Sequence, residues 1–289
     1  MHHRSEKMTL GFTAKSNFKR GFLLGAAIAW MHAFAVYGVE LKPWIGTQYS
    51  LDLYGSCLIQ QFEELDTRCG VLEKPEVDAF YDFSALMAVK EFATVELQLS
   101  ALNSKHQIFG LSALRLTGRY FFLNDIIGDL VSLAAGVTVS QIFHAAKRNI
   151  ATFDHGGIAF EGHVAIGKEF SCEQFWTSRA WSVIGLGIAD AGYPWLRANL
   201  VWERNWWEIH QFKLFAESLW GFGHKKLSIH PFHGYGPVRY QAIDLGLRYS
   251  LRLENDALLS IGYAHRVLGR NCPRNVNFLK LEASYPFSL

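Results

Sequence analysis

Arginine residues recur at alternate positions in several segments of this chain, with acidic residues nearby. Arg115 and Arg119 are four residues apart, and Arg248 and Arg252 repeat that spacing. In an extended strand such residues share a face, so each pair presents two positive charges on one side. These charges could line a path for a solute, or they could only pair with acids and fill an interior. The charged residues that we expect on an interior wall are Arg115, Arg119, Glu161, Arg179, Arg197, Glu217, Arg248 and Arg252.

The histidines do not form a recognised catalytic or metal-binding pattern. His163 lies close to Glu161, which favours a buried pair over a catalytic base. His224, His230 and His233 cluster in a Gly- and Pro-rich stretch, where their spacing matches no known metal motif and favours a solvated loop. Nucleophilic catalysis would need an activated side chain beside a base. We therefore expect no catalytic residue, no metal and no cofactor.

The four cysteines have no spacing suited to a zinc site. Cys57 and Cys69 fall in one expected loop and could form a disulfide if the chain is exported, or could remain free. Cys172 and Cys272 fall on expected turns at opposite ends, too far apart to meet.

Strands with one apolar and one polar face must position these residues. From residue 39 onward, apolar and polar side chains alternate in about twelve segments, for example Val95, Leu97 and Leu99 against Glu96 and Gln98. Most of the segments exceed the roughly 9–11 residues that a tilted strand needs to cross a bilayer. The expected strands are residues 39–54, 79–90, 91–101, 108–122, 130–143, 157–168, 175–188, 195–204, 207–222, 238–253, 256–268 and 276–289.

The connections between these strands differ in length according to their order. Every expected connection longer than ten residues is odd-numbered, namely residues 55–78, 144–155 and 223–237. In an antiparallel meander, odd connections lie at one end and even connections at the other. A soluble sandwich has no reason to sort its loops in this way, whereas outer-membrane barrels have long extracellular loops and short periplasmic turns.

The closing segment, residues 276–289, resembles the C-terminal assembly signal of Gram-negative outer-membrane β-barrels. Leu279, Leu281, Tyr285 and Phe287 alternate with polar residues and end on an aromatic pair, although Ser288 and Leu289 follow Phe287. The resemblance implies an all-β fold: a single antiparallel up-and-down transmembrane β-barrel of about twelve strands. It also implies that Tyr285 and Phe287 act as an assembly signal for the barrel-assembly machinery, in a membrane of outer-membrane lipid and lipopolysaccharide.

The N-terminus has the pattern of a secretory signal peptide. Lys15, Lys19 and Arg20 precede an apolar run, and Ala33 and Ala35 fit the small-x-small rule for cleavage. We therefore expect a signal peptide at residues 1–35 and a mature barrel at residues 36–289, with a transmembrane anchor as the alternative. The net charge of +2 is too small to indicate nucleic-acid binding.

These observations favour a narrow channel, or porin, for small solutes in the bacterial outer membrane. A twelve-stranded barrel lies between filled eight-stranded barrels and wide sixteen-stranded porins. The mixed charges of the interior predict little charge selectivity. A structural or adhesive surface protein is an alternative, with residues 55–78 and 223–237 as contact loops. An outer-membrane lipid-modifying enzyme, such as a lipase or deacylase, is the less favoured alternative, and we expect that the protein is not an enzyme.

Overall fold

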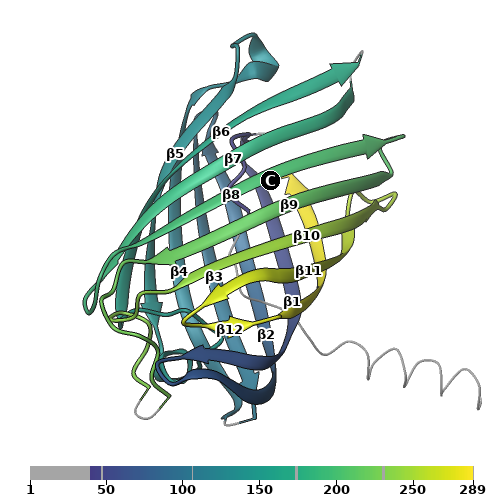
Figure 1. The fold of residues 1–289 in the computed structure, drawn as a ribbon. Coiled ribbons are helices and arrows are strands. Elements are labelled where there is room, and N and C mark those ends of the chain that lie inside the picture. The colour runs from purple at the N-terminus through teal and green to yellow at the C-terminus, as the bar shows by residue number, and fades with distance from the viewer. Residues whose placement is uncertain (1–39, 47, 106, 173–174, 230–231, 289) are drawn as a thin grey trace, which may run out of the picture. The chain divides into compact units, whose positions relative to one another are not determined.

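The alternating segments form one antiparallel sheet that closes into a barrel (Figure 1). The computed structural model describes residues 40–288 except 47, 106, 173–174 and 230–231. The expected signal peptide at residues 1–35 lies outside the described residues. Within the described part, no helix has both the length and the apolar character needed to span a membrane.

Twelve long strands and one short one, β12, make up the sheet. Consecutive strands pair from β1 to β11, β11 pairs with β13, and the short β12 pairs with β1, which confirms the expected up-and-down barrel of about twelve strands. The strands are β1 (Ser50–Thr67), β2 (Gly70–Lys90), β3 (Ala93–Ser104), β4 (Gln107–Leu123), β5 (Ser132–Ile142), β6 (Ile158–Cys172), β7 (Phe175–Ala189), β8 (Trp195–Trp206), β9 (His210–Gly221), β10 (Gln241–Arg252), β11 (Leu258–Arg270), β12 (Pro273–Arg274) and β13 (Asn277–Ser288).

The first strand closes the barrel against the last part of the chain. Ser50 of β1 pairs with Ser288 of β13, and Glu64 of β1 pairs with Arg274 of β12. Both pairings belong to the same antiparallel register, so β1 runs without a shift along β13 and β12. Closure removes the free sheet edges, which would leave backbone donors and acceptors without partners in lipid.

The two faces of the wall differ as the alternation predicts. Outward side chains in the middle of the strands are apolar and exposed, for example Leu97, Leu186 and Leu247. Inward positions carry buried polar side chains, among them Glu96, Arg119 and Arg248. An Arg or Lys at the bilayer centre would cost about 2–4 kcal/mol on the outward face, so this segregation suits a wall that faces lipid.

The expected first strand and first loop were both wrong. The first strand is Ser50–Thr67 rather than residues 39–54, and residues 55–78 form most of a long hairpin rather than a loop. Beyond Ser56 the buried inward positions are Leu58, Gln60 and Phe62, while Glu63 points outward and is exposed. Apolar residues inside, a charged residue outside and a bulge after Phe62 break the expected alternation, and they concealed the strand.

Cys57 and Cys69, which the sequence leaves either paired or unpaired, do not form a disulfide with each other. Cys57 lies within β1, whereas Cys69 lies in the turn that follows Thr67. At about 3.3 Å per residue, the strand between them separates their Cα atoms far beyond the 7 Å limit for a disulfide.

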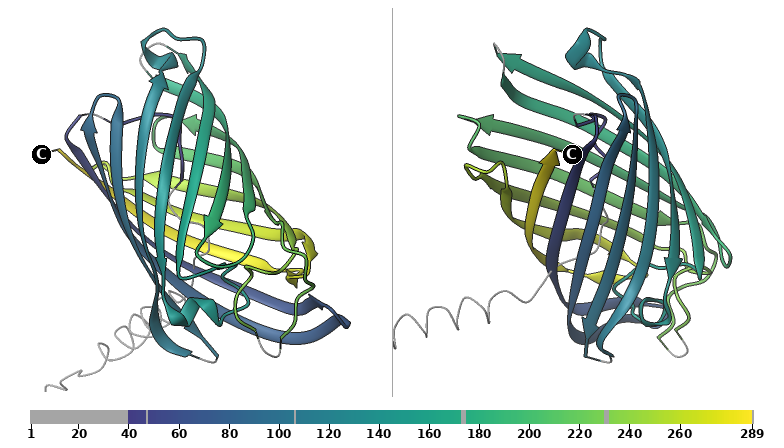
Figure 2. Two further views of the ribbon diagram at one scale, coloured as in Figure 1. Left: turned by 90° about the vertical axis from the view of Figure 1, so that its left-hand side faces the viewer. Right: turned by 180° about the vertical axis from the view of Figure 1, so that it is seen from behind.

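Two long connections lie at one end of the barrel (Figure 2). They are residues 143–157, which contain helix α2 (His144–Lys147), and residues 222–240. We call this end the long-loop end. The short-turn end carries the connections after the even-numbered strands β2 to β10, including the 3₁₀ helix η1 (Asp125–Ile127). Both connections longer than ten residues are odd-numbered, as the sequence predicts.

The closing strand generates a first prediction. Tyr285 and Phe287 point outward from β13 and contact each other, with ring centroids 4.5 Å apart. Phe287→Ala should reduce assembly, because the loss of apolar burial at the seam with β1 costs about 1 kcal/mol of stabilising free energy. Heat-modifiable gel mobility of the membrane fraction measures the assembled share. Phe122→Ala is the control, since Phe122 is an exposed aromatic of β4 that contacts Tyr120 far from the seam; equal losses in both variants would contradict a special role of the closing strand.

Candidate functional site

A segment that precedes β1 lies inside the barrel. We call residues 40–46 the lumen segment. Leu41 is buried in an apolar cluster with three inward residues of β7 and β8, which are Trp181, Val183 and Val201. The alternation predicts this segment in the wall, although Pro43 and Gly46 interrupt it and argue against a central strand. That signal could have identified the lumen segment.

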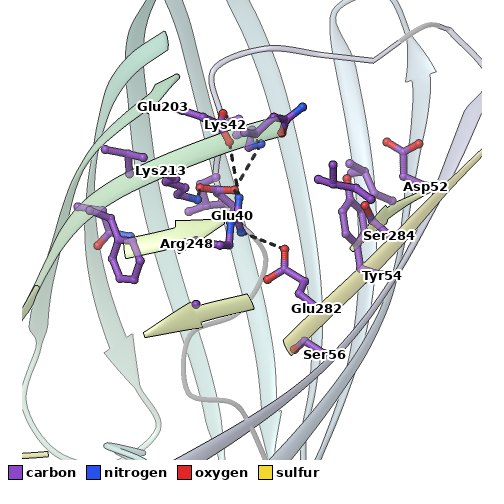
Figure 3. Close-up of a pocket in the computed structure, with 18 of the residues that line it drawn as sticks. Glu40, Lys42, Asp52, Tyr54, Ser56, Glu203, Lys213, Arg248, Glu282 and Ser284 are labelled. Carbon is purple, nitrogen blue, oxygen red and sulfur yellow. Dashed lines mark hydrogen bonds and ion pairs between the residues drawn. The ribbon is translucent and has the colours of Figure 1, made fainter. Parts of the chain in front are cut away.

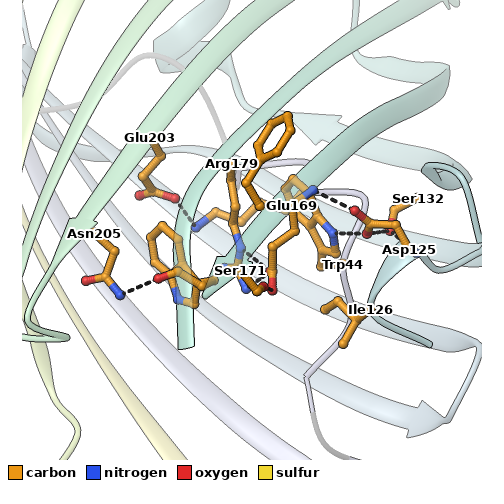
Figure 4. A network of polar contacts seen from close by, with 12 residues as sticks. Trp44, Asp125, Ile126, Ser132, Glu169, Ser171, Arg179, Glu203 and Asn205 are labelled. Carbon is orange, nitrogen blue, oxygen red and sulfur yellow. Dashed lines mark hydrogen bonds and ion pairs between the residues drawn. The ribbon is translucent and has the colours of Figure 1, made fainter. Parts of the chain in front are cut away.

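Polar contacts fasten the lumen segment at the short-turn end (Figure 4). The Trp44 indole N–H donates to Oδ1 of Asp125 in η1 at 2.9 Å. Ser132 and the backbone N–H of Glu169 donate to the same carboxylate. Burial of Asp125 acts to raise its pKa, but these hydrogen bonds outweigh burial and hold the pKa below its ordinary value.

Aromatic contacts reinforce this attachment. The ring of Trp44 meets that of Trp181 edge to face, with centroids 5.5 Å apart. The Arg179 guanidinium lies 5.1 Å from the Trp44 ring centroid and 4.3 Å from that of Trp176. Its Nε also donates to Glu169 at 2.6 Å. Cation–π contacts and a charge-assisted hydrogen bond therefore fix Arg179 beside the segment.

Deeper in the lumen, the carboxylate of Glu40 contacts basic residues of the wall (Figure 3). It forms ion pairs with Lys213 of β9 and with Arg248 of β10, the latter at 3.2 Å. Lys42 of the same segment lies 3.4 Å from Glu40 and 4.0 Å from Glu203 of β8. Arg248 also contacts Glu282 of β13 at 2.9 Å. The lumen segment is therefore part of the charge network of the wall.

Elsewhere on the wall, inward cations pair with acids of nearby strands. Arg266 and Asp244 form a bidentate pair, with N···O distances of 2.7 and 2.9 Å. Arg119 lies 3.4 Å from Glu96. Such pairs satisfy charges that are removed from bulk water.

The pair between Arg197 and Glu161 reaches across an intervening strand. These residues lie on β8 and β6, with β7 between them. A Cβ at Gly185 of β7 would approach the Glu161 carboxylate to 2.8 Å, so glycine leaves the room that this contact needs. His163, also on β6, is buried beside this pair on the inner wall.

The lumen contains two cavities, of about 540 and about 130 Å³. Leu41 of the lumen segment lines both cavities, together with Gln98 and Arg197 of the wall, and most of the rest of the segment borders the larger cavity. The lining of the larger cavity extends to Asp256 and Pro286 at the short-turn end. The smaller cavity borders connection 143–157 through Asp154 and His155.

Apolar packing of the two long connections covers the long-loop end. Phe153 of connection 143–157 packs against Tyr235 and Tyr240, with ring centroids 4.7 and 5.0 Å apart. The Tyr235 hydroxyl donates to the carbonyl of Ile150 at 2.7 Å. Leu65 of β1 and Trp195 of β8 belong to the same buried cluster. The connections therefore fold onto the barrel wall.

All eight charged residues that the sequence placed on the interior wall line a cavity. Arg115 and Glu161 line the smaller cavity, and Arg197 lines both. The others line the larger cavity; they are Arg119, Arg179, Glu217, Arg248 and Arg252. The alternation did not predict that Glu40, Lys42 and Trp44 line the larger cavity, because it indicates a wall strand for their segment. Their role in a solute path stays a prediction.

Of the three clustered histidines, His224 and His233 line neither cavity. His224 packs edge to face against Tyr193, and His233 is exposed. His230 lies outside the described residues.

Comparison with known proteins finds neither a matching protein-family model nor a matching curated protein. Solved structures do match. An outer-membrane channel from Pseudomonas putida F1 is similar over 87% of this chain and 100% of its own, with a TM-score of 0.62 and 9% identity. The NanC porin is similar over 81% of this chain and 98% of its own, with a TM-score of 0.55 and 8% identity.

The fold, the exposed apolar belt and these similarities define the class of the protein. It is a closed antiparallel β-barrel with an apolar outer face, and it has the fold of bacterial outer-membrane β-barrels, as the resemblance of its closing strand implies. At such low identity the similarity concerns the fold, and the lumen of this chain has to be interpreted from its own residues.

Two neighbouring residues of connection 143–157 respond to pH in opposite directions. Burial lowers the pKa of His155 to about 3, because the charged imidazolium would lack hydration inside the protein. Burial also raises the pKa of Asp154 to about 6, against the attraction of Arg115. When the connection opens, both groups regain ordinary values. Acidification therefore favours opening through His155, which is protonated only when exposed, and favours closure through Asp154, which is protonated while buried.

Single variants should separate these two effects. In the Asp154→Asn variant only His155 titrates, so lowering the pH from about 7 to about 5 should shift the equilibrium toward the open connection by about 2 kcal/mol. In the His155→Gln variant only Asp154 titrates, and the same change in pH should shift the equilibrium toward the closed connection by about 1 kcal/mol. Hydrogen–deuterium exchange of residues 149–157, corrected for intrinsic rates, measures the opening. A pH response of the same sign in both variants would refute the assignment.

Proposed function

We propose that this barrel is a narrow, gated channel for small solutes, and that the structure corresponds to its closed state. The observation that carries the proposal is the charged lumen, which holds two cavities beside the lumen segment. A barrel with a purely structural role would be filled by packed side chains, as small barrels are. A cavity of about 540 Å³ falls within the size range of small-molecule sites.

Two barriers close the path, and they differ in construction. The first is the lumen segment, which hydrogen bonds, ion pairs and ring contacts attach to the wall. The second is the apolar packing of the two long connections. Both can move without breaking the strand ladders, so a path can open while the sheet stays closed. The channel and porin among the similar structures support this proposal.

We also propose an orientation for the barrel in the outer membrane. The long-loop end faces outward, toward lipopolysaccharide, and the short-turn end faces the periplasm, as in other outer-membrane barrels. The barrel-assembly machinery inserts the chain through its closing strand. The larger cavity then extends to the periplasmic rim, and the two long connections form the outer barrier.

An adhesive surface role is the second candidate. The tip of the β1–β2 hairpin exposes Val71, Leu72 and Val77, which could contact a partner. Exposed apolar residues on a loop or hairpin are a common feature of interaction surfaces.

Loosening the lumen segment should raise conductance. Trp44→Ala removes the hydrogen bond to Asp125 and the ring contacts with Trp181 and Arg179. We expect the open fraction in planar bilayers to rise at least about tenfold, because the half-buried Trp44 loses all of these contacts with the wall at once. Trp206→Ala, at an exposed position on the outer face, is the control and should leave conductance unchanged. Absence of conductance in both the parent protein and Trp44→Ala would exclude the channel.

Two natural thiols test the orientation. Cys69 is exposed in the β1–β2 turn at the long-loop end, and Cys172 is exposed at the short-turn end. A membrane-impermeant maleimide should label Cys69 on intact cells, whereas labelling of Cys172 should need permeabilised cells. Cys69→Ser and Cys172→Ser variants assign each signal. Labelling of Cys172 on intact cells would reverse the proposed orientation.

A further inference from the structure

The carboxylate of Glu40 is bound by the wall much as a small anionic solute would be. Lys213 and Arg248 both contact it, and they come from neighbouring strands, while Glu40 belongs to a segment outside the sheet (Figure 3). Lys213 and Arg248 lie directly opposite each other in the β9–β10 register. Both are buried.

Two like charges placed opposite each other across a ladder repel, so this pair needs an anion nearby. Glu203 of β8 faces Lys213 in the next ladder and lies 3.8 Å from Arg248. Glu282 lies 2.9 Å from Arg248. These acids approach from the flanking wall, whereas Glu40 approaches from the lumen. Among the residues that the structure describes, Lys213 forms its ion pair with Glu40.

The surroundings leave room for a larger ligand. Lys213, Arg248 and Glu40 all line the larger cavity. Gly262 of β11 lies between Arg248 and Lys280 in the strand register and contributes no side chain. Hydroxyl groups of Tyr54, Ser56 and Ser284 line the opposite side of the same cavity (Figure 3). In addition, Nε of Arg248 is buried without a hydrogen-bond partner.

We propose that Lys213 and Arg248 form a binding site for the carboxylate of a small organic anion, and that Glu40 occupies this site in the closed barrel. The inference rests on the proposed channel and names its substrate class. A solute carboxylate replaces Glu40 at the two cations, and the lumen segment then loses one of its attachments to the wall. Binding of solute and release of the segment are therefore coupled.

The charge balance favours anions over neutral solutes. Once Glu40 leaves, four cations face two acids: Glu203 lies near Lys42 and Arg248, and Glu282 lies near Lys280 and Arg248. A neutral solute of the same size would supply no carboxylate to Lys213, which forms an ion pair with Glu40 in the closed barrel.

Equilibrium binding to the refolded full-length barrel in detergent tests the site. The probe is sodium gluconate, with glucose as a neutral solute of similar size, and isothermal titration calorimetry is the measurement. Glu40→Gln should raise the affinity for gluconate by about tenfold or more, because the internal competitor loses its charge. Glucose should show no such gain.

Substitutions at the wall identify the residues responsible. In the Glu40→Gln background, Lys213→Met should abolish the gain, whereas Lys213→Arg should keep it. Lys226→Met removes an exposed lysine from connection 222–240 and should have no effect. Heat-modifiable gel mobility confirms that each variant is folded.

The outcomes separate this inference from the proposed channel. Gluconate affinity that is unchanged by Glu40→Gln, or that survives Lys213→Met, overturns the carboxylate site even if the barrel conducts ions. Binding that follows the expected pattern in a barrel without conductance supports the site and rejects the channel. A gain in affinity for glucose equal to that for gluconate would also overturn it, since it would show that opened space rather than charge determines binding.

Discussion

The requirement that every backbone N–H and C=O within lipid be hydrogen-bonded governs this structure. A flat sheet would leave two edges open, so β1 must meet the C-terminal strands, and it does so in one register from Ser50 to Leu65. Once the sheet is closed, each inward side chain has only other lumen residues and water as partners. The ion pairs of the wall and the position of the lumen segment both follow from that enclosure.

Enclosure also explains why a segment outside the sheet can belong to the charge network. The lumen has no low-dielectric lipid next to its charges, but neither does it have the full hydration of an open surface. Lys213 and Arg248 face each other on adjacent strands, and the carboxylate of Glu40 lies between the wall and the cavity beside them. An acid on the sheet would neutralise such a pair permanently. An acid on a separate segment can neutralise the pair and later move away from it.

Most of the wall could be predicted from the sequence, because lipid imposes an apolar residue at every second position. The alternation located the strands from β3 onward to within a few residues, and it placed all eight charged candidates beside a cavity. The prediction failed at β1, where the hairpin carries buried Leu58 and Phe62 inside and exposed Glu63 outside. It failed again at residues 40–46, where a short alternating run imitates a strand. Contacts such as Trp44 with Asp125 join residues far apart in sequence, and no local pattern reports them.

The lumen segment constrains the order in which the molecule can be built. It directly precedes β1, the strand that closes the barrel, and it lies on the inner side of the completed wall. A closed ring of hydrogen-bonded strands offers no lateral entry to a chain. The segment must therefore be in place when the last ladder forms, or thread through an opening at one end afterwards. In the first route, Glu40 and Lys42 are available as ion-pair partners before the barrel closes. The segment could then help to align the strands that later surround it.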